Sequence, residues 1–356
     1  MKEIIDELND KGEVIGVIDK DIAHKEGRLH RSIHLWLIND EGEVLLQKRC
    51  EDKKLYPNTW DISVGGHVST KEDPMHALFR ETKEELGIDL DLENLEYFET
   101  IHERLKYDDI DSNELVDVFI ARQNIKEFDI IIQKEEVVDV RWVSIEELFY
   151  LMYNNQLLPH EEEYKKMREY LIKLKLSLTL RRISDYPKLG INFKDVTTIL
   201  NDPFAYQHAI DALASKTPQD VDVIVGPEAR GIMFAAPVAY KLKKGYVPVR
   251  KPNKLPAETI SQEYQLEYGT DTLEIHKDAI KHGQNVAIID DLMATGGTME
   301  AIIKLVERLG GNVEKVLCLI DLPELGGRER ISNYDYSYVL SESEEEPVKK
   351  RALQNK

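Results

Sequence analysis

Cysteine is scarce in this sequence of 356 residues. The two cysteines, Cys50 and Cys318, lie far apart in apolar, strand-like segments. This argues against disulfides, and we expect two buried thiols in a reducing, cytoplasmic compartment. Long apolar runs are also missing, and the amino-terminal residues MKEIIDELNDKGE contain no signal-peptide core. We therefore expect neither a membrane span nor a membrane partner.

Positive charge is in short supply as well. Lys and Arg number 47 against 67 Asp and Glu, which gives a formal net charge of −20. Such an acidic chain is disfavoured as a non-specific binder of nucleic acid. Its 42% of hydrophobic residues is enough for packed cores, and its length allows two ordinary domains. We place the domains at residues 1–165 and 166–341, and we expect the charged residues 342–356 to form a disordered tail.

The segment that organises the second half is VAIIDDLMATGGT, residues 286–298. An apolar strand pattern ends in Asp290 and Asp291, and a Thr-Gly-Gly-Thr loop then leads into a helical pattern. Backbone N–H groups at such a helix start can bind a phosphate, and glycines let the backbone approach it. The paired acids suit the 2- and 3-hydroxyls of a ribose. A polar turn of any doubly wound protein is the alternative, but the segment resembles the ribose-5-phosphate loop of type I phosphoribosyltransferases.

Other segments of the second half resemble adenine phosphoribosyltransferases, in the order that this family has them. GINFKD (residues 190–195) matches the segment that frames the purine, and EARG (228–231) matches the pyrophosphate loop. RKPNK (250–254) matches the basic residues that meet pyrophosphate, and LEYG (266–269) follows a polar lid at 261–264. Lys194 stands where the family usually has arginine.

This resemblance implies that adenine and phosphoribosyl pyrophosphate react to give AMP and pyrophosphate, with magnesium on the pyrophosphate and a homodimer formed through this domain. Glu267 would accept the purine N7 proton as the catalytic residue. The residues implied in substrate binding are Phe193, Arg230, Arg250, Lys251, Lys254, Tyr268, Asp290, Asp291, Ala294, Thr295, Gly296, Gly297 and Thr298.

The first half contains a helix that carries several carboxylates. In residues 66–88, Asp73 can cap a helix that has Pro74 at its first position, and Gly87 can end it. Three glutamates spaced three and four apart share one face of this helix, and such like charges repel unless a cation lies between them. The alternative is a solvated acidic face. The acids that carry the pattern are Glu72, Glu81, Glu84 and Glu85.

The spacing of these acids and of Arg80 reproduces the signature of Nudix hydrolases, except that Thr82 replaces an aliphatic residue. The resemblance implies cleavage of a nucleoside diphosphate derivative with Mg²⁺ or Mn²⁺. Arg80 would orient the glutamates. The implied metal ligands are Glu81, Glu84, Glu85 and Glu72, and the implied catalytic residues are Arg80, Glu81, Glu84 and Glu85.

The flanking sequence resembles the Nudix branch that includes isopentenyl-diphosphate isomerase. The isomerase uses a cysteine where this chain has Gly65, so we favour hydrolysis. His30 and His67 correspond to isomerase histidines that bind a second metal, and His24 matches less securely. A histidine on a strand is more often structural when taken alone. Glu114 is a weaker candidate, as a base.

The predicted fold class is α/β: a Nudix α/β/α sandwich with a mixed sheet, then a type I phosphoribosyltransferase fold with a parallel, Rossmann-like sheet. Residues 161–183, at the junction, have the pattern of one long helix. We expect a bifunctional purine-salvage enzyme whose Nudix substrate is an ADP-containing diphosphate such as ADP-ribose. The alternatives are a Nudix half that only binds or senses nucleotide, and a transcriptional regulator, for which the chain lacks a basic module.

Overall fold

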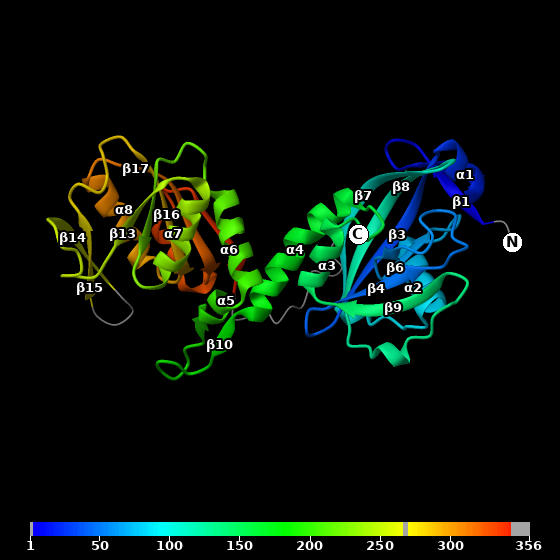
Figure 1. Ribbon diagram of the computed structural model, residues 1–356, viewed down its shortest axis with the longest axis horizontal. Coiled ribbons are helices and arrows are strands. Elements are labelled where there is room, and N and C mark those ends of the chain that lie inside the picture. Colours follow the sequence, from blue (N-terminus) through cyan, green and yellow to red (C-terminus); the bar gives the residue numbers. More distant parts are fainter. Residues whose placement is uncertain (1–2, 266–269, 343–356) are drawn as a thin grey trace. The chain divides into compact units, whose positions relative to one another are not determined.

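The computed structural model describes residues 3–265 and 270–342, which form two compact units (Figure 1). The units divide between Leu171 and Ile172, within helix α4 (Glu161–Thr179). Cys50 and Cys318 are buried and free. Among the described residues, no helix is both long and apolar enough to cross a membrane.

The first unit is built on a mixed sheet of seven strands. Its order is β5-β4-β3-β8-β7, with β6 paired to β3 and β9 paired to β4. Strand β3 runs parallel to β8 and antiparallel to its other partners, β4 and β6. The elements are β1 (Ile4–Leu8), β2 (Val14–Asp19), α1 (Lys20–Glu26), β3 (Leu29–Ile38), β4 (Val44–Arg49), β5 (Trp60–Asp61), β6 (Val64–His67), α2 (Pro74–Leu86), η1 (Leu92–Asn94), β7 (Leu95–Tyr107), β8 (Ile110–Arg122), η2 (Glu127–Asp129), β9 (Val137–Val143) and α3 (Ile145–Tyr153).

The two faces of β3 carry different kinds of side chain. Ile33, Leu35 and Leu37 pack in one apolar core with Ala77 and Leu78 of α2. Because side chains alternate across a strand, the residues between them point to the opposite face. Those residues are His30, Ser32, His34 and Trp36, all of them buried. The central strand therefore anchors the core on one side and presents polar groups on the other.

Helix α2 begins and ends where the sequence predicts. The Asp73 side chain accepts a hydrogen bond from Met75 N, and Gly87 ends the helix at a φ of 70°. Thr82 is fully buried, and its hydroxyl donates to the Leu78 carbonyl at 2.7 Å. The hydroxyl is thereby satisfied within the helix, which explains how threonine is accommodated where an aliphatic residue is usual.

The second unit contains a parallel sheet in the order β13-β12-β16-β17-β18. One apolar core packs α6 and α7 on one face of the sheet, and a second packs α8 on the other. This coverage of both faces is typical of a doubly wound sheet. The elements are β10 (Arg181–Ile183), β11 (Phe193–Asp195), α5 (Thr197–Asn201), α6 (Pro203–Lys216), β12 (Val223–Pro227), α7 (Arg230–Leu242), β13 (Gly245–Val249), β14 (Thr259–Gln265), β15 (Thr270–His276), β16 (Asn285–Met293), α8 (Gly297–Arg308), β17 (Asn312–Asp321), η3 (Pro323–Leu325), α9 (Gly327–Arg330) and β18 (Tyr336–Ser341).

One expectation of local structure is wrong. The helix predicted over residues 161–183 ends at Thr179, because Arg181–Ile183 pairs with Phe193–Asp195 as strand β10. Pairing with a neighbouring strand here overrides the local helical pattern. Residues 261–264, predicted as a lid, belong to strand β14, which pairs along β15 in an antiparallel hairpin, and their role as a lid stays a prediction.

Replacing the α2 cap tests how far this helix depends on its first turn. We expect Asp73→Ala to lower the free energy of unfolding of the first unit by about 1 kcal/mol, because the N–H of Met75 loses its partner. Urea titration followed by tryptophan fluorescence measures this unit, since it contains all three tryptophans, Trp36, Trp60 and Trp142.

The matched control is Asp89→Ala, because Asp89 is exposed and makes a surface ion pair with Lys83. We expect that substitution to change the free energy of unfolding by less than about 0.5 kcal/mol. Equal effects of the two substitutions would show that the cap does not stabilise α2.

Candidate active sites

Arg80 of α2 holds the acids of the first unit together. Its guanidinium donates to both carboxylate oxygens of Glu72, at 2.9 and 2.8 Å. It also donates to Glu81 at 2.7 Å and to Glu84 at 3.3 Å. A further bond at 3.1 Å reaches the His67 carbonyl, which ties α2 to β6. Arg80 therefore fixes the positions of these acids before any ligand arrives.

Glu81 and Glu85 lie in surroundings that favour their neutral forms. Burial raises the pKa of Glu81 against the effect of Arg80, and it raises the pKa of Glu85 to about 8. Gln47 donates to Glu85 at 3.2 Å. A Cβ on Gly66 would lie 2.3 Å from Cγ of Glu81, so glycine is required for Glu81 to reach this position.

Three histidines and one carboxylate converge outside α2. The Nε2 atom of His24 lies 3.3 Å from that of His30 and 3.1 Å from that of His67. One oxygen of Glu114 lies 3.9, 3.7 and 3.9 Å from the same three nitrogens. These four donors come from α1, β3, β6 and β8, and we call them the histidine cluster.

The histidine cluster has the donors of a metal site. Burial lowers the pKa of His24 and of His67, which favours their neutral, metal-binding forms, whereas Glu114 raises the pKa of His30 against the effect of burial. Although burial opposes it, the histidines lower the pKa of Glu114 well below its usual value, so this side chain is ionised. Three imidazoles with one carboxylate suit Mn²⁺, Zn²⁺ or Fe²⁺ better than Mg²⁺, which prefers oxygen.

The predicted metal ligands of α2 do not converge in this way. Among the described residues, two groups bring three or more ligand atoms within 4.8 Å, and neither includes Glu72, Glu81, Glu84 or Glu85. One is the histidine cluster, and the other contains His34, His160 and Glu163. Glu84 is 54% exposed, whereas Glu85 is buried. A role of the α2 acids in metal binding stays a prediction.

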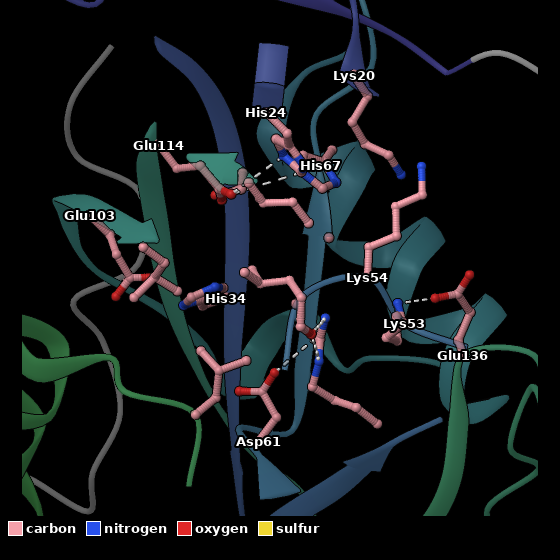
Figure 2. Close-up of a pocket in the computed structure, with 18 of the residues that line it drawn as sticks. Lys20, His24, His34, Lys53, Lys54, Asp61, His67, Glu103, Glu114 and Glu136 are labelled. Atoms are coloured by element: carbon pink, nitrogen blue, oxygen red, sulfur yellow. Dashed lines mark hydrogen bonds and ion pairs between the residues drawn. The ribbon is translucent and has the colours of Figure 1, made fainter. Parts of the chain in front are cut away.

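A cavity of about 280 Å³ adjoins the histidine cluster (Figure 2). It is lined there by His24, His67 and Glu114 and by the glycines Gly65 and Gly66. Lys20, Arg49, Lys53 and Lys54 also line it, and each of these cations is paired with an acid. The acids are Glu3, Asp61, Glu136 and Asp21, respectively. A metal-binding cluster beside several cations is suited to a polyanion such as a diphosphate.

In the second unit, Asp290 and Asp291 lie near the carboxyl end of β16, shortly before the loop that connects β16 to α8. Both are buried, and Arg230 Nε lies 2.8 Å from Asp291 Oδ2. Burial and the neighbouring charge of Asp291 raise the pKa of Asp290 well above its usual value. Asp290 therefore keeps a proton and can donate a hydrogen bond. The Arg230 guanidinium also lies 5.3 Å from the Phe193 ring centre, so the predicted base and phosphate residues are neighbours.

The loop before α8 is shaped by close backbone contacts. Gly296 has a φ of 77°, and Gly297 begins the helix. A Cβ on Gly327 would lie 2.3 Å from the Ala294 carbonyl, so α9 can approach the loop because this residue is glycine. Residues 294–298 thus lead into the N-terminus of α8, which is the arrangement of an anion site.

The basic residues predicted to bind pyrophosphate, Arg250, Lys251 and Lys254, lie in the turn after β13. Arg250 donates to Glu228 at 2.5 Å, and the Lys251 side chain lies 3.1 Å from Asp271. Lys254 is exposed. The structure therefore brings Arg230, Phe193 and the paired aspartates together. Arg250 and Lys251 instead form ion pairs with Glu228 and Asp271. Glu267 and Tyr268 lie outside the described residues.

Sequence reasoning missed the acids Glu228 and Asp271, which hold those basic side chains. It also missed His34, His160 and Glu163, because Glu163 is far from His34 in the sequence. Alternating polar residues in LHRSIHLW of β3 were the available signal, since His30, Ser32 and His34 must share one face.

The raised pKa of Glu85 predicts how stability depends on pH. When a chelator keeps the protein free of metal, Glu85 of the folded chain holds a proton between pH 4.5 and 8. The unfolded chain releases that proton in the same range. The free energy of unfolding of the first unit should therefore fall as pH rises through this window, by on the order of 5 kcal/mol. Glu85→Gln should remove most of this fall in urea titrations read by tryptophan fluorescence. The exposed Glu93→Gln is the control, and an unchanged slope in Glu85→Gln would contradict the assignment.

Comparisons with known proteins agree with the two units. A NUDIX domain model matches residues 28–171, and a phosphoribosyl transferase domain model matches residues 195–350. The adenine phosphoribosyltransferase of Clostridium novyi is 57% identical over 163 residues, which are 46% of this chain and 95% of the relative. That of Alkaliphilus metalliredigens is 54% identical over 168 residues, 47% of this chain and 99% of the relative.

Among solved structures, the adenine phosphoribosyltransferase from Thermoanaerobacter pseudethanolicus is 51% identical, with a TM-score of 0.47. The match covers 48% of this chain and 99% of that chain. The sequence identity over nearly the whole length of the curated relatives decides the assignment. The chain belongs to the adenine phosphoribosyltransferase family through its second unit, and it carries a NUDIX domain in its first.

Proposed function

We propose that the chain is a bifunctional enzyme of purine salvage. Its second unit converts adenine and phosphoribosyl pyrophosphate to AMP and pyrophosphate, and its first hydrolyses a nucleoside diphosphate derivative with a divalent metal. The 57% identity to an adenine phosphoribosyltransferase, over 95% of that relative, carries the first activity. The histidine cluster beside a cavity, together with the match of a NUDIX domain model to residues 28–171, supports the second.

For the transferase, the paired aspartates take the ribose hydroxyls. Asp290 donates through its proton, whereas Asp291 accepts. The N–H groups at the start of α8 bind the 5-phosphate. Purine N9 forms a bond to ribose C1 as the C1–oxygen bond breaks, and pyrophosphate leaves with that electron pair. The N7 proton passes to Glu267, and Arg230 balances the charge of the leaving pyrophosphate.

For the hydrolase, the substrate's diphosphate lies between the histidine cluster and the cationic side chains of the cavity. A divalent ion held by the cluster would neutralise phosphate charge and make a water molecule more acidic. Lys20 and Lys54 line the same end of the cavity and can contact phosphate oxygens (Figure 2). Glu81, with its raised pKa, lies against Gly66 at the edge of this region and can exchange a proton.

ADP-ribose is the first substrate to assay. Its hydrolysis gives AMP, the transferase product, and ribose 5-phosphate, a precursor of the transferase cosubstrate. The two units would then act on related metabolites. Because both sites are on one chain, they are present at equal concentrations.

Removing one aspartate should affect only the transferase. We expect Asp291→Ala to lower kcat/KM for AMP formation at least about 100-fold, because a ribose hydroxyl loses its acceptor and Arg230 loses its partner. Manganese-dependent hydrolysis should be unchanged.

Adenine should be used in strong preference to hypoxanthine, and similar rates with both bases would contradict the adenine assignment.

Removing one cluster histidine should affect only the hydrolase. We expect His67→Gln to weaken Mn²⁺ binding about 10- to 100-fold by calorimetry and to abolish hydrolysis of ADP-ribose, while AMP formation stays unchanged. The control is His102→Gln, because His102 lies outside the cluster and binds Asn113. Hydrolysis that survives in His67→Gln would remove the cluster from the mechanism. Manganese and ADP-ribose binding without hydrolysis would indicate a nucleotide-sensing unit instead.

A further inference from the structure

In the second unit, a residue predicted to bind pyrophosphate already has an anionic partner. The side-chain nitrogen of Lys251 lies 3.1 Å from Oδ2 of Asp271, on strand β15. The neighbouring Arg250 donates to Glu228 in a similar way. Carboxylates therefore hold cationic groups that the transferase needs for the oxygens of pyrophosphate.

The backbone places Lys251 beside Asp271, so their contact is more than the chance pairing of an exposed lysine. Arg250 and Glu274 exchange two backbone hydrogen bonds, of 2.9 and 2.7 Å, which join the end of β13 to β15. The N–H of Lys251 donates to Glu228 at 3.1 Å. Because its backbone is held on both sides, Lys251 keeps its side chain within reach of Asp271.

Asp271 can release Lys251 without being left unpaired. Its Oδ1 atom accepts a hydrogen bond from Thr272 N at 2.8 Å, and Tyr264, its neighbour across the β14–β15 hairpin, also interacts with it. Although burial opposes it, these contacts and Lys251 lower the pKa of Asp271, so the carboxylate is ionised. When Lys251 leaves, the carboxylate still has donors for its charge.

The ion pair is also exposed enough to exchange a partner. The side chain of Lys251 is 56% exposed, and that of Asp271 is 25% exposed. Such an ion pair is weak because water screens it and solvates the released ammonium. The pair of Asp321 with Arg328 in the same unit is different, because the Asp321 side chain is fully buried. A charged ligand can therefore displace Asp271 from Lys251 at little cost.

Pyrophosphate is such a ligand. It offers several charged oxygens to an ammonium group, whereas Asp271 places one oxygen at 3.1 Å. If the carboxylate and a phosphate oxygen both held Lys251, the two anions would lie next to each other and repel. The two anions therefore compete for Lys251.

We infer that Asp271 is an internal competitor of pyrophosphate for Lys251. When phosphoribosyl pyrophosphate binds, its diphosphate takes Lys251 from Asp271, and Asp271 takes Lys251 back when pyrophosphate leaves. Asp271 thus lowers the affinity of the transferase for its own product and favours product release. This inference rests on the proposed function, because it takes Lys251 as a pyrophosphate-binding residue.

Inhibition of AMP formation by added pyrophosphate tests this inference, because it records only the transferase site of the full-length chain. With Mg²⁺ in excess, we expect Asp271→Asn to lower the inhibition constant of pyrophosphate about fivefold. The KM for phosphoribosyl pyrophosphate should fall by a similar factor. Asparagine keeps the shape of the side chain, and a folding defect would not tighten binding. An unchanged or higher inhibition constant would overturn the inference.

A double substitution shows whether the effect depends on Lys251. In the Lys251→Ala background, Asp271→Asn should change the inhibition constant by less than about twofold, because no ion pair is left to break. Equal tightening with and without Lys251 would overturn the inference, since the carboxylate would then act through its charge alone. The matched control is Glu258→Gln, which removes an exposed ion pair with Lys277 at the other end of the hairpin. It should leave both constants unchanged.

Lys251→Ala by itself separates this inference from the proposed function. We expect it to raise the inhibition constant of pyrophosphate about 10-fold, because a charged donor is lost. If that constant does not change while AMP is formed, the inference fails and the transferase assignment stands. If the wild-type chain forms no AMP from adenine and phosphoribosyl pyrophosphate, the proposed function fails and the inference fails with it.

Discussion

Carboxylates held away from water are the constraint on which both candidate sites depend. A buried charge is costly unless a partner or a proton compensates it, and each unit meets this requirement in its own way. In the first unit Arg80 bonds to Glu81, and Glu85 retains its proton. In the second unit the proton stays on Asp290, while Arg230 pairs with Asp291. The acids are therefore positioned before any substrate binds.

Strand β3 shows how one segment meets two opposite demands. Its position in the middle of the sheet fills one face with aliphatic side chains that pack on α2. The other face is equally buried but carries imidazole, hydroxyl and indole groups. Because a shift of one residue would exchange these faces, the apolar core also fixes the register of the site. The stability of the fold and the placement of ligand-binding groups thus have the same origin.

Local signals predicted much of the fold. The cap at Asp73, the stop at Gly87 and the turn from β16 into a helix are each encoded within a few residues, and the structure places each of them there. Phosphate binding by the loop after Asp291 stays a prediction. The histidine cluster was only a possibility from sequence. Its members come from four elements, and it forms because β3 pairs with both β6 and β8.

The remaining parts could not be predicted, because they depend on pairing between distant residues. Glu163 contacts His34 across a separation of 129 residues, and no pattern near either residue reveals it. Strand β10 likewise exists only because residues 193–195 pair with it, so its helical pattern was misleading. The ion pairs of Arg250 with Glu228 and of Lys251 with Asp271 could not be predicted for the same reason.

Helix α4 limits how such a two-part gene can be recombined. Its first turns belong to the first unit, where Glu163 holds His34 of the cavity wall and Met167 and Leu171 are buried. Its last turn belongs to the second unit, where Leu176 joins the core. An exchange of the transferase for another domain must therefore keep the chain to Leu171. A crossover only nine residues earlier, before Glu163, would transmit an intact NUDIX signature with an incomplete cavity.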